Sequence, residues 1–266
     1  MNSLRIGCVK YLNARPLIRG WPGEVAFDHP SALCRKLADG ELEVALVSSF
    51  EFLRNPIYRI VDNVSISSNG PVYSVVVAHQ GDISKVQDID LDPASLTAVN
   101  LLRCVLAELG LKPRLKPAVL GSTPKAVGVV AGSLPAISDA RLLIGDQAIR
   151  FRQKHGGDLH FWDLGEQWKK LVGLPFVYAL WLIRPEFGDS ETIASRLRAL
   201  RDENLAELDK LIVEEKEFDP EFCSRYYREY LRFSFEEREK EGLRTFATLC
   251  AKHGLLSQRD VVLRVA

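Results

Sequence analysis

Two long apolar segments, at residues 72–78 and 176–183, constrain the fold of this chain more than any other feature. Both are rich in β-branched and aromatic residues and have almost no polar face, which is typical of strands buried on both sides of a sheet. Short strands and helices alternate between them, and a similar block precedes the first. We therefore expect a two-lobed α/β fold, with lobe 1 at residues 1–80 and 178–266 and lobe 2 at residues 81–177.

The first block predicts strands at residues 4–9, 24–28 and 44–47, with helices starting near Arg15 and at residues 31–37 and 50–54. This order is typical of a parallel sheet with crossover helices. The second block predicts strands at residues 88–92 and 141–144 and helices at 95–109, 125–132 and 147–154. From residue 189 the pattern predicts helices at 190–217, 220–233, 235–253 and from 257 onward, so we expect a helical C-terminal region that packs on lobe 1.

The composition excludes several classes of function. Lys and Arg together number 35, as do Asp and Glu, so no net charge attracts nucleic acid or an anionic membrane. We expect a cytoplasmic protein, because the first residues lack a leader pattern and no apolar run reaches transmembrane length. The five cysteines and five histidines lack metal-ligand spacing, and no phosphate loop or dinucleotide motif occurs. We therefore expect no metal and no organic cofactor.

Small polar residues gather where the predicted strands end. In an open α/β sheet, small ligands bind at the carboxyl ends of the strands. At a predicted helix start, the free N–H groups and the helix dipole favour an anion. Each of these residues fits a helix cap as well as a ligand contact, and they are Asn13, Ser48, Ser49, Ser68, Asn69, Gly70, Ser95, Thr97, Gly145 and Asp146. From the residues alone, we predict a two-lobed binder of a small anion and leave open whether it is an enzyme.

Five segments, at residues 5–18, 44–54, 66–77, 142–149 and 163–181, read RIGCVKYLNARPLI, VALVSSFEFLR, ISSNGPVYSVVV, LLIGDQAI and DLGEQWKKLVGLPFVYALW. In this order and spacing they resemble the chorismate dehydratases of the futalosine route to menaquinone. The resemblance implies a periplasmic-binding-protein-like fold of type II, with a ligand cleft between the lobes. It also implies a hydro-lyase that removes water from the dianion chorismate to give 3-[(1-carboxyvinyl)oxy]benzoate.

The resemblance also implies roles for individual residues. Catalytic roles fall on Asn13, Ser68 and Asp146. Substrate binding falls on Ser49, Asn69, Gly70, Ser95, Leu96, Thr97, Pro175 and Phe176. Leu96 stands where the family motif Ser-Arg-Thr has its arginine, so one cation is missing, and Lys10 or Arg15 is our hypothesis for its replacement.

The proton-abstracting base is left open between two groups. Asn13 and the serines are neutral at pH 7 and are not strong bases. The base is therefore either Asp146 or the substrate's own side-chain carboxylate, and we favour the substrate. Two other functions stay open: a cytoplasmic module that binds or senses a small anion, and the related dihydroxynaphthoate synthase, which uses a histidine in the region of Asp146. The oligomeric state is not predicted.

Overall fold

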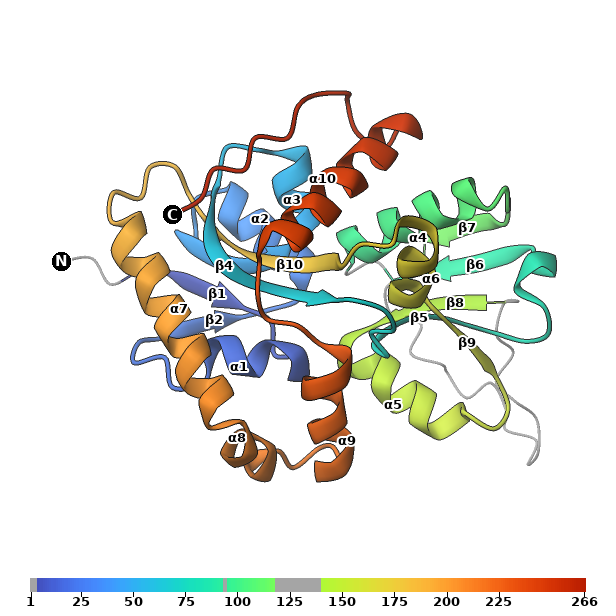
Figure 1. The fold of residues 1–266 in the computed structure, drawn as a ribbon, viewed down its shortest axis with the longest axis horizontal. Coiled ribbons are helices and arrows are strands. Elements are labelled where there is room, and N and C mark those ends of the chain that lie inside the picture. The colour runs from blue at the N-terminus through green and yellow to red at the C-terminus, as the bar shows by residue number, and fades with distance from the viewer. Residues whose placement is uncertain (1–3, 93–94, 118–139) are drawn as a thin grey trace.

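The computed structural model describes residues 4–92, 95–117 and 140–266, which form two five-stranded sheets side by side (Figure 1). Sheet 1 has the order β2-β1-β3-β10-β4 and sheet 2 the order β7-β6-β8-β5-β9. The strands of sheet 1 are β1 (Ile6–Cys8), β2 (Val25–Phe27), β3 (Val44–Ser48), β4 (Arg59–Ser68) and β10 (Phe176–Ile183). Those of sheet 2 are β5 (Val75–His79), β6 (Asp88–Leu91), β7 (Arg114–Pro117), β8 (Ala140–Ile144) and β9 (His160–Asp163).

Both sheets are mixed, whereas the sequence pattern predicted a parallel sheet. β1 runs parallel to β2 and β3, but β10 is antiparallel to β3 and β4. In the same way, β6 runs parallel to β7 and β8, whereas β5 is antiparallel to β8 and β9. In each sheet the antiparallel strand is the one that arrives from the other half of the molecule, so the exchange of strands between the halves causes the difference.

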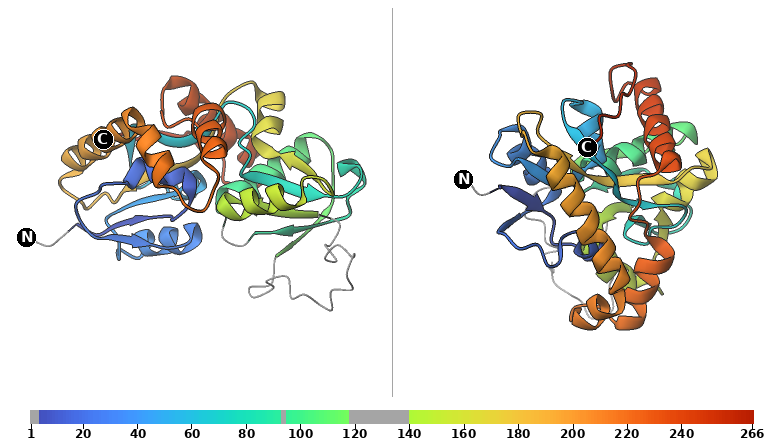
Figure 2. Two further views of the ribbon diagram at one scale, coloured as in Figure 1. Left: turned by 90° about the horizontal axis from the view of Figure 1, so that it is seen from below. Right: turned by 60° about the vertical axis from the view of Figure 1, so that its left-hand side comes forward.

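Helices cover the faces of both sheets (Figure 2). α7 packs against α1 and β4, while α10 packs against β10 and α4. The helical segments before β10 are η1 (Leu12–Ala14), α1 (Arg15–Ile18), α2 (Pro30–Ala38), α3 (Ser49–Arg54), η2 (Ile83–Lys85), α4 (Leu96–Glu108), α5 (Gly145–His155) and α6 (Leu164–Val172). Those of the C-terminal region are α7 (Ser190–Ala206), α8 (Leu208–Glu214), α9 (Pro220–Arg225), a π-helical turn (Tyr226–Tyr230) and α10 (Glu237–Lys252).

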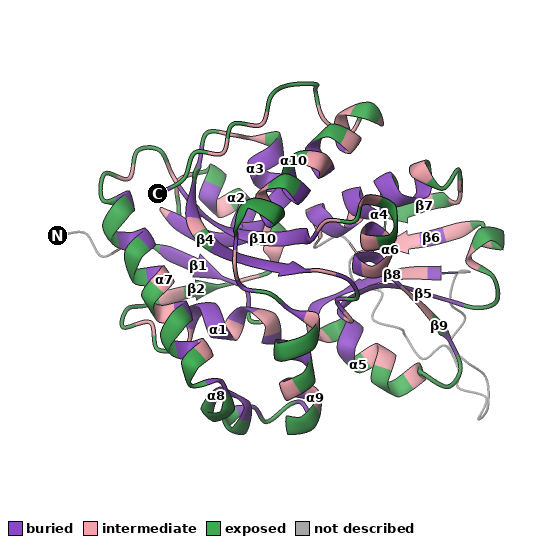
Figure 3. Ribbon diagram, in the orientation of Figure 1, coloured by how far each residue is buried: buried purple, intermediate pink, exposed green. Residues whose placement is uncertain are grey.

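The interior strands are buried along most of their length (Figure 3). One core cluster includes residues of both sheets, and a group of aromatic side chains lies in it between α6, β10 and α10. Trp168, Phe176 and Phe246 pack there edge to face, with ring centroids 5.0–5.9 Å apart. The two halves therefore share a core beside the chain crossings. Within the described ranges, no helix combines the length and the apolar character needed to cross a membrane.

The structure confirms the strands and helices expected over the first 54 residues and corrects the C-terminal end. The helix expected from residue 257 onward is wrong, because the chain there is extended and pairs with the edge of β4. Ile60 N–H donates to the Arg264 carbonyl at 2.7 Å, and Ala266 N–H donates to the Ile60 carbonyl at 2.9 Å. The β-branched Val265, which lies opposite Ile60, suits such pairing, and an open sheet edge offers unpaired backbone groups.

Other expectations differ from the structure or are not tested by it. The helix expected at 190–217 is divided at Glu207 into α7 and α8, and β4 was not predicted. The helix expected at 125–132 lies outside the described residues. The lobe boundaries at residues 80 and 178 stay a proposal; hydrogen bonding joins β5, which ends at His79, to sheet 2 and β10, which begins at Phe176, to sheet 1.

Candidate functional site

A cavity of about 80 Å³ is lined by residues from both sheets. Its apolar wall comes from the ends of five strands and includes Val9, Val47, Ile66, Val75 and Ile144. Its polar groups are uncharged, and they are Tyr11, Asn13, Ser48, Ser95, Thr97 and Tyr178. Among the described residues, no Lys, Arg, Asp or Glu lines the cavity. Such a wall suits a small ring with polar substituents.

Four helices begin at this cavity. Pro30 is the first residue of α2, Ser48 precedes α3, Leu96 opens α4 and Gly145 opens α5, and all four residues line the cavity. Helix N-termini carry partial positive charge and present backbone N–H groups, so they favour an anion. The cavity can therefore attract carboxylates without a cationic side chain.

Among the polar side chains of the cavity, Asn13 has an acceptor oxygen that receives no hydrogen bond from the described residues. Its side chain lies beside the hydroxyl of Tyr226, which donates to Ser74 Oγ at 2.7 Å. The Asn13 Oδ1 atom is buried and accepts no hydrogen bond from any described residue. Since a buried acceptor without a donor costs roughly 1–3 kcal/mol, this oxygen is available to a ligand hydroxyl.

Hydroxyl groups join the starts of α3 and α4 across the cavity. Thr97 Oγ1 contacts the hydroxyl of Ser48 and accepts the Phe50 N–H at 3.2 Å. Ser49 Oγ lies 3.3 Å from Thr97 Oγ1 and donates to the Val177 carbonyl at 2.7 Å. The structure therefore brings Ser48 and Thr97 to the cavity, whereas the hydroxyl of Ser49 faces β10.

Ser95 and Leu96 also lie at the cavity, as the first turn of α4. Ser95 Oγ accepts the Ala98 N–H at 3.1 Å and so caps the helix. Leu96 brings an apolar side chain to the wall in place of a cation. Pro93 and Ala94, which precede this turn, lie outside the described residues.

Neither cation suggested as a replacement lines the cavity. Lys10 and Arg15 line a separate hollow of about 580 Å³, which shares the wall residue Val9 with the cavity. Arg15 is paired with the buried carboxylate of Glu215 at 2.5 Å. The helix N-termini are therefore the positive groups at the cavity itself.

Ser68, Asn69 and Gly70 lie outside the cavity lining. Ser68 is buried, donates to the Gly70 carbonyl at 3.0 Å and lies 3.0 Å from the hydroxyl of Tyr178. Asn69 Oδ1 accepts from Lys169 Nζ at 2.7 Å, on the side of α6. Because Tyr178 does line the cavity, its hydroxyl connects Ser68 to that space. The role predicted for Ser68 stays a prediction.

Pro175 and Phe176 also lie away from the cavity. The Pro175 carbonyl accepts from Trp168 Nε1 at 3.2 Å, and the Phe176 ring packs against Trp168 and Phe246. Both residues therefore belong to the core between β10 and α10. Their assignment to substrate binding stays a prediction.

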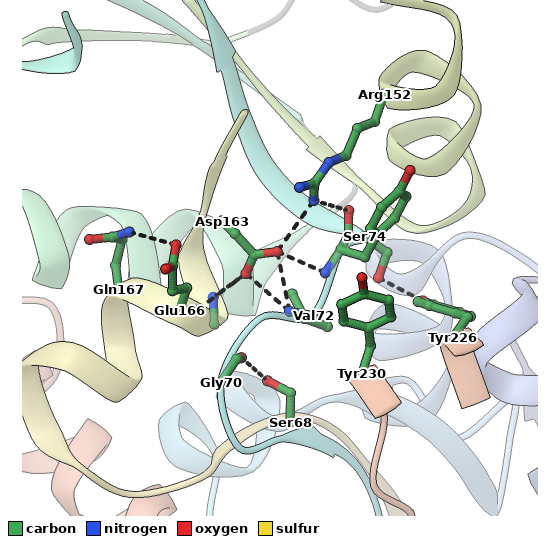
Figure 4. A network of polar contacts seen from close by, with 12 residues as sticks. Ser68, Gly70, Val72, Ser74, Arg152, Asp163, Glu166, Gln167, Tyr226 and Tyr230 are labelled. Atoms are coloured by element: carbon green, nitrogen blue, oxygen red, sulfur yellow. Dashed lines mark hydrogen bonds and ion pairs between the residues drawn. The ribbon is translucent and has the colours of Figure 1, made fainter. Parts of the chain in front are cut away.

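Asp163 organises the chain crossing beside the cavity, and the sequence analysis did not single it out (Figure 4). Its carboxylate accepts the N–H groups of Val72, Tyr73, Gly165 and Glu166 at 2.8–3.2 Å. It thus caps α6 and holds the start of the chain entering β5. The sequence signal was present, because an Asp that precedes a helix is a strong N-cap.

Asp146 joins the two halves of the molecule. Its Oδ1 atom accepts the Leu12 N–H at 2.8 Å, and its side chain is half-buried beside the cavity rather than part of the lining. Burial raises the pKa of this carboxyl to about 6, against the opposing effects of the Leu12 N–H and Arg150. Asp146 is thus a half-buried acceptor at the junction, turned toward the backbone of Leu12, the residue before Asn13.

Comparisons with known proteins agree with this architecture. The sequence model described as "Menaquinone biosynthesis" matches residues 4–252. A chorismate dehydratase from Thermus thermophilus is 29% identical over 270 residues, which cover 93% of this chain and 95% of that protein.

Two solved structures show the fold. Protein AF1704 from Archaeoglobus fulgidus matches with a TM-score of 0.70 at 20% identity, over 96% of this chain and 100% of the other. The CA3427 gene product of Candida albicans, described as having the generic periplasmic binding protein fold, matches with a TM-score of 0.64 at 13% identity, over 100% of this chain and 96% of the other. The expected periplasmic-binding-protein-like fold is confirmed.

Proposed function

The chain belongs to the menaquinone biosynthesis family, and from that premise we propose that it removes water from chorismate to give 3-[(1-carboxyvinyl)oxy]benzoate. The relative from Thermus thermophilus carries the name chorismate dehydratase, which supports this choice within the family. The observation that carries the proposal is the open acceptor of Asn13 in an uncharged cavity bordered by four helix N-termini.

The cavity matches the chemistry of the substrate. Chorismate is a small ring with two carboxylates, one ring hydroxyl and an enolpyruvyl ether. The apolar wall suits the ring faces, and the starts of α4 and α5 suit the carboxylates. The Asn13 carbonyl would accept the ring hydroxyl and fix its orientation.

The volume of about 80 Å³ is below the roughly 300–1,000 Å³ of typical ligand sites. Substrate binding therefore requires the two halves to separate, and the described conformation corresponds to the closed state. Separation of the halves would break the contacts of the Thr97 hydroxyl, which are with the Ser48 hydroxyl and the Phe50 N–H.

The reaction removes the proton from the ring carbon that bears the ether and the hydroxyl from its neighbour, and the ring becomes aromatic. Burial raises the pKa of Tyr11 to about 12 and that of Tyr178 well above its usual value, so both phenols stay protonated at pH 7. With no charged side chain in the described lining, the substrate's own side-chain carboxylate is the nearest base. The protein's task is then to hold that carboxylate and the ring in a reactive geometry.

The direct test is to incubate the purified protein with chorismate and follow product formation by absorbance and mass spectrometry. We expect a benzoate-type spectrum and a product lighter by one water. Unchanged chorismate, bound at the cavity, would instead support the alternative of a module that binds or senses a small anion, which the absence of a protein base in the described lining also fits. The same assay separates dihydroxynaphthoate synthase, whose substrate is a cyclised futalosine product.

A further inference from the structure

We propose that Asp146 is a positioning residue, which holds Asn13 in its working place by fixing the backbone of Leu12, and that it does not remove the substrate's proton. This inference rests on the proposed function, since the place of Asn13 matters through its contact with the substrate. It assigns a role to the carboxylate of Asp146, for which the proposed reaction by itself gives none.

Leu12 is held from two directions by side chains distant in sequence. Its N–H donates to Asp146 Oδ1 at 2.8 Å, and its carbonyl accepts from the Tyr227 hydroxyl at 2.9 Å. Asp146 belongs to α5, whereas Tyr227 lies in the π-helical turn of the C-terminal region. Both backbone groups of this residue are therefore fixed, and the 3₁₀ turn η1 cannot rotate without breaking a hydrogen bond.

Asn13 is the next residue of η1, so the hydrogen bonds that fix the Leu12 backbone also restrict the position of Asn13. Its side chain lies beside Tyr226, the neighbour of Tyr227, and its Oδ1 atom is buried and unpartnered among the described residues. Rotation of η1 would carry that oxygen away from the cavity. A displacement of about 1 Å at a reacting group costs on the order of 10²-fold in rate, so a hydrogen bond one residue away is able to control turnover.

The start of α5 is pressed against the same turn. Gly145 has φ +57°, donates its N–H to the Ser74 carbonyl at 2.8 Å and lines the cavity. A Cβ atom at this position would lie 2.9 Å from the ring of Tyr11, so only glycine fits. Asp146 comes next and is turned toward Leu12 instead of the cavity. A general base must lie within hydrogen-bond reach of the proton it removes, whereas Asp146 is absent from the cavity lining and its Oδ1 atom already accepts the Leu12 N–H.

Two substitutions at the same position separate positioning from proton removal. Asp146→Asn keeps an oxygen that can accept the Leu12 N–H, whereas Asp146→Leu keeps the branched shape of the side chain without an acceptor. We expect Asp146→Asn to retain kcat within about 5-fold and Asp146→Leu to lose about 10²-fold in kcat with a smaller change in KM. Loss of activity in Asp146→Asn, with the fold intact, would overturn the inference in favour of Asp146 as the base.

A double-mutant cycle tests whether Asp146 acts through Asn13. We expect Asn13→Ala alone to lower kcat by about 10²–10³-fold, and Asp146→Leu to add little in that background. Full additivity of the two effects would contradict the inference. Asp82→Ala is the matched control, because Asp82 also accepts a backbone N–H, from Ser84 at 2.9 Å, but at an exposed helix start; its kcat should equal that of the wild type.

Amide hydrogen exchange of the ligand-free protein tests the positioning role of Asp146 independently of any turnover of chorismate. We expect the Leu12 amide to exchange at least about 10-fold faster in Asp146→Leu than in the wild type or Asp146→Asn, because it loses its acceptor. Equal exchange in all three would overturn the inference even if chorismate is turned over. If the wild type leaves chorismate unchanged, the proposed function fails, and the Leu12 exchange still decides whether Asp146 positions the turn.

Discussion

The carboxylate of Asp163 accepts the N–H of Tyr73 at 2.8 Å, at the point where the chain passes from sheet 1 into sheet 2. Tyr73 has φ +68°, a left-handed conformation that is rare for a residue with a bulky side chain. Arg152 lies 3.5 Å from the same carboxylate and 4.1 Å from the centre of the Tyr73 ring. The crossing between the two halves is thus held in a strained conformation by one buried acceptor and its cation (Figure 4).

We expect Asp163→Asn to destabilise the fold by about 3 kcal/mol, because an amide supplies one acceptor oxygen where the structure uses two and removes the partner of Arg152. Urea unfolding at pH 7 measures this. Asp219→Asn is the matched control, since Asp219 also caps a helix, accepting from Glu221 and Phe222, but at an exposed position where Asn caps equally well. Equal stability of the two variants would contradict the role given to Asp163.

Thr97 provides a prediction about the contact between the halves. Thr97→Val removes the acceptor of the Phe50 N–H and the partner of the Ser48 hydroxyl at nearly constant volume. We expect a loss of about 1–3 kcal/mol in the free energy of unfolding, since buried polar groups lose their partner. Thr97→Ser keeps the hydroxyl and should lose less than half as much. A Thr97→Val variant as stable as the wild type would show that this contact does not hold the closed conformation.

The pH dependence of stability follows from Asp146. Its folded pKa is raised from 3.8 to about 6, so its stabilising contribution is complete below pH 3.8 and is lost as the pH rises through about 6. The charged or titratable groups around it are Tyr11, Arg150, Glu215, Glu217, Cys223 and Tyr226.

Asp146→Asn removes this titration. Relative to the variant, the wild type should therefore lose on the order of 1 kcal/mol of unfolding free energy between pH 3.8 and pH 7, after a discount for the half-exposed side chain. Urea unfolding of both proteins across this range measures the difference. Parallel pH profiles would mean that Asp146 has the same pKa in the folded and unfolded chain.

Ser68 is tested together with Tyr178. If Ser68 acts by orienting the Tyr178 hydroxyl at the cavity, Ser68→Ala and Tyr178→Phe should each lower kcat by about 10-fold or more, and the double variant should be little worse than the poorer single one. Steady-state kinetics with chorismate measure all three. Wild-type kcat in Ser68→Ala would end the prediction that Ser68 is catalytic.

Much of the fold could be predicted from local patterns. Helical spacing with a following glycine placed α2, and the apolar run at residues 44–47 placed β3. β4 was missed because its outward residues are polar and Asn63, at φ +58°, interrupts its regular alternation. The C-terminal tail was assigned to a helix because its pairing partner, the edge of β4, is some 200 residues away in sequence.

The site was predictable only to the level of strand and helix ends. The strand-end pattern predicted that Asn13, Ser95 and Thr97 lie near one another. They line one cavity, because the carboxyl ends of their strands meet between the two sheets. Which way a side chain turns at such an end depends on tertiary contacts. Ser49 faces β10 while its neighbour Ser48 lines the cavity, and Asp146 turns to the backbone of Leu12.

The most direct measurement is the initial rate of 3-[(1-carboxyvinyl)oxy]benzoate formation from chorismate by the wild type, Asn13→Ala and Asn55→Ala. Asn55 is the control, because its amide donates to Tyr58 away from the cavity. We expect turnover by the wild type and Asn55→Ala, and a rate about 10²–10³-fold lower for Asn13→Ala. Equal rates for all three proteins, or no product from any of them, would contradict dehydration of chorismate at this cavity.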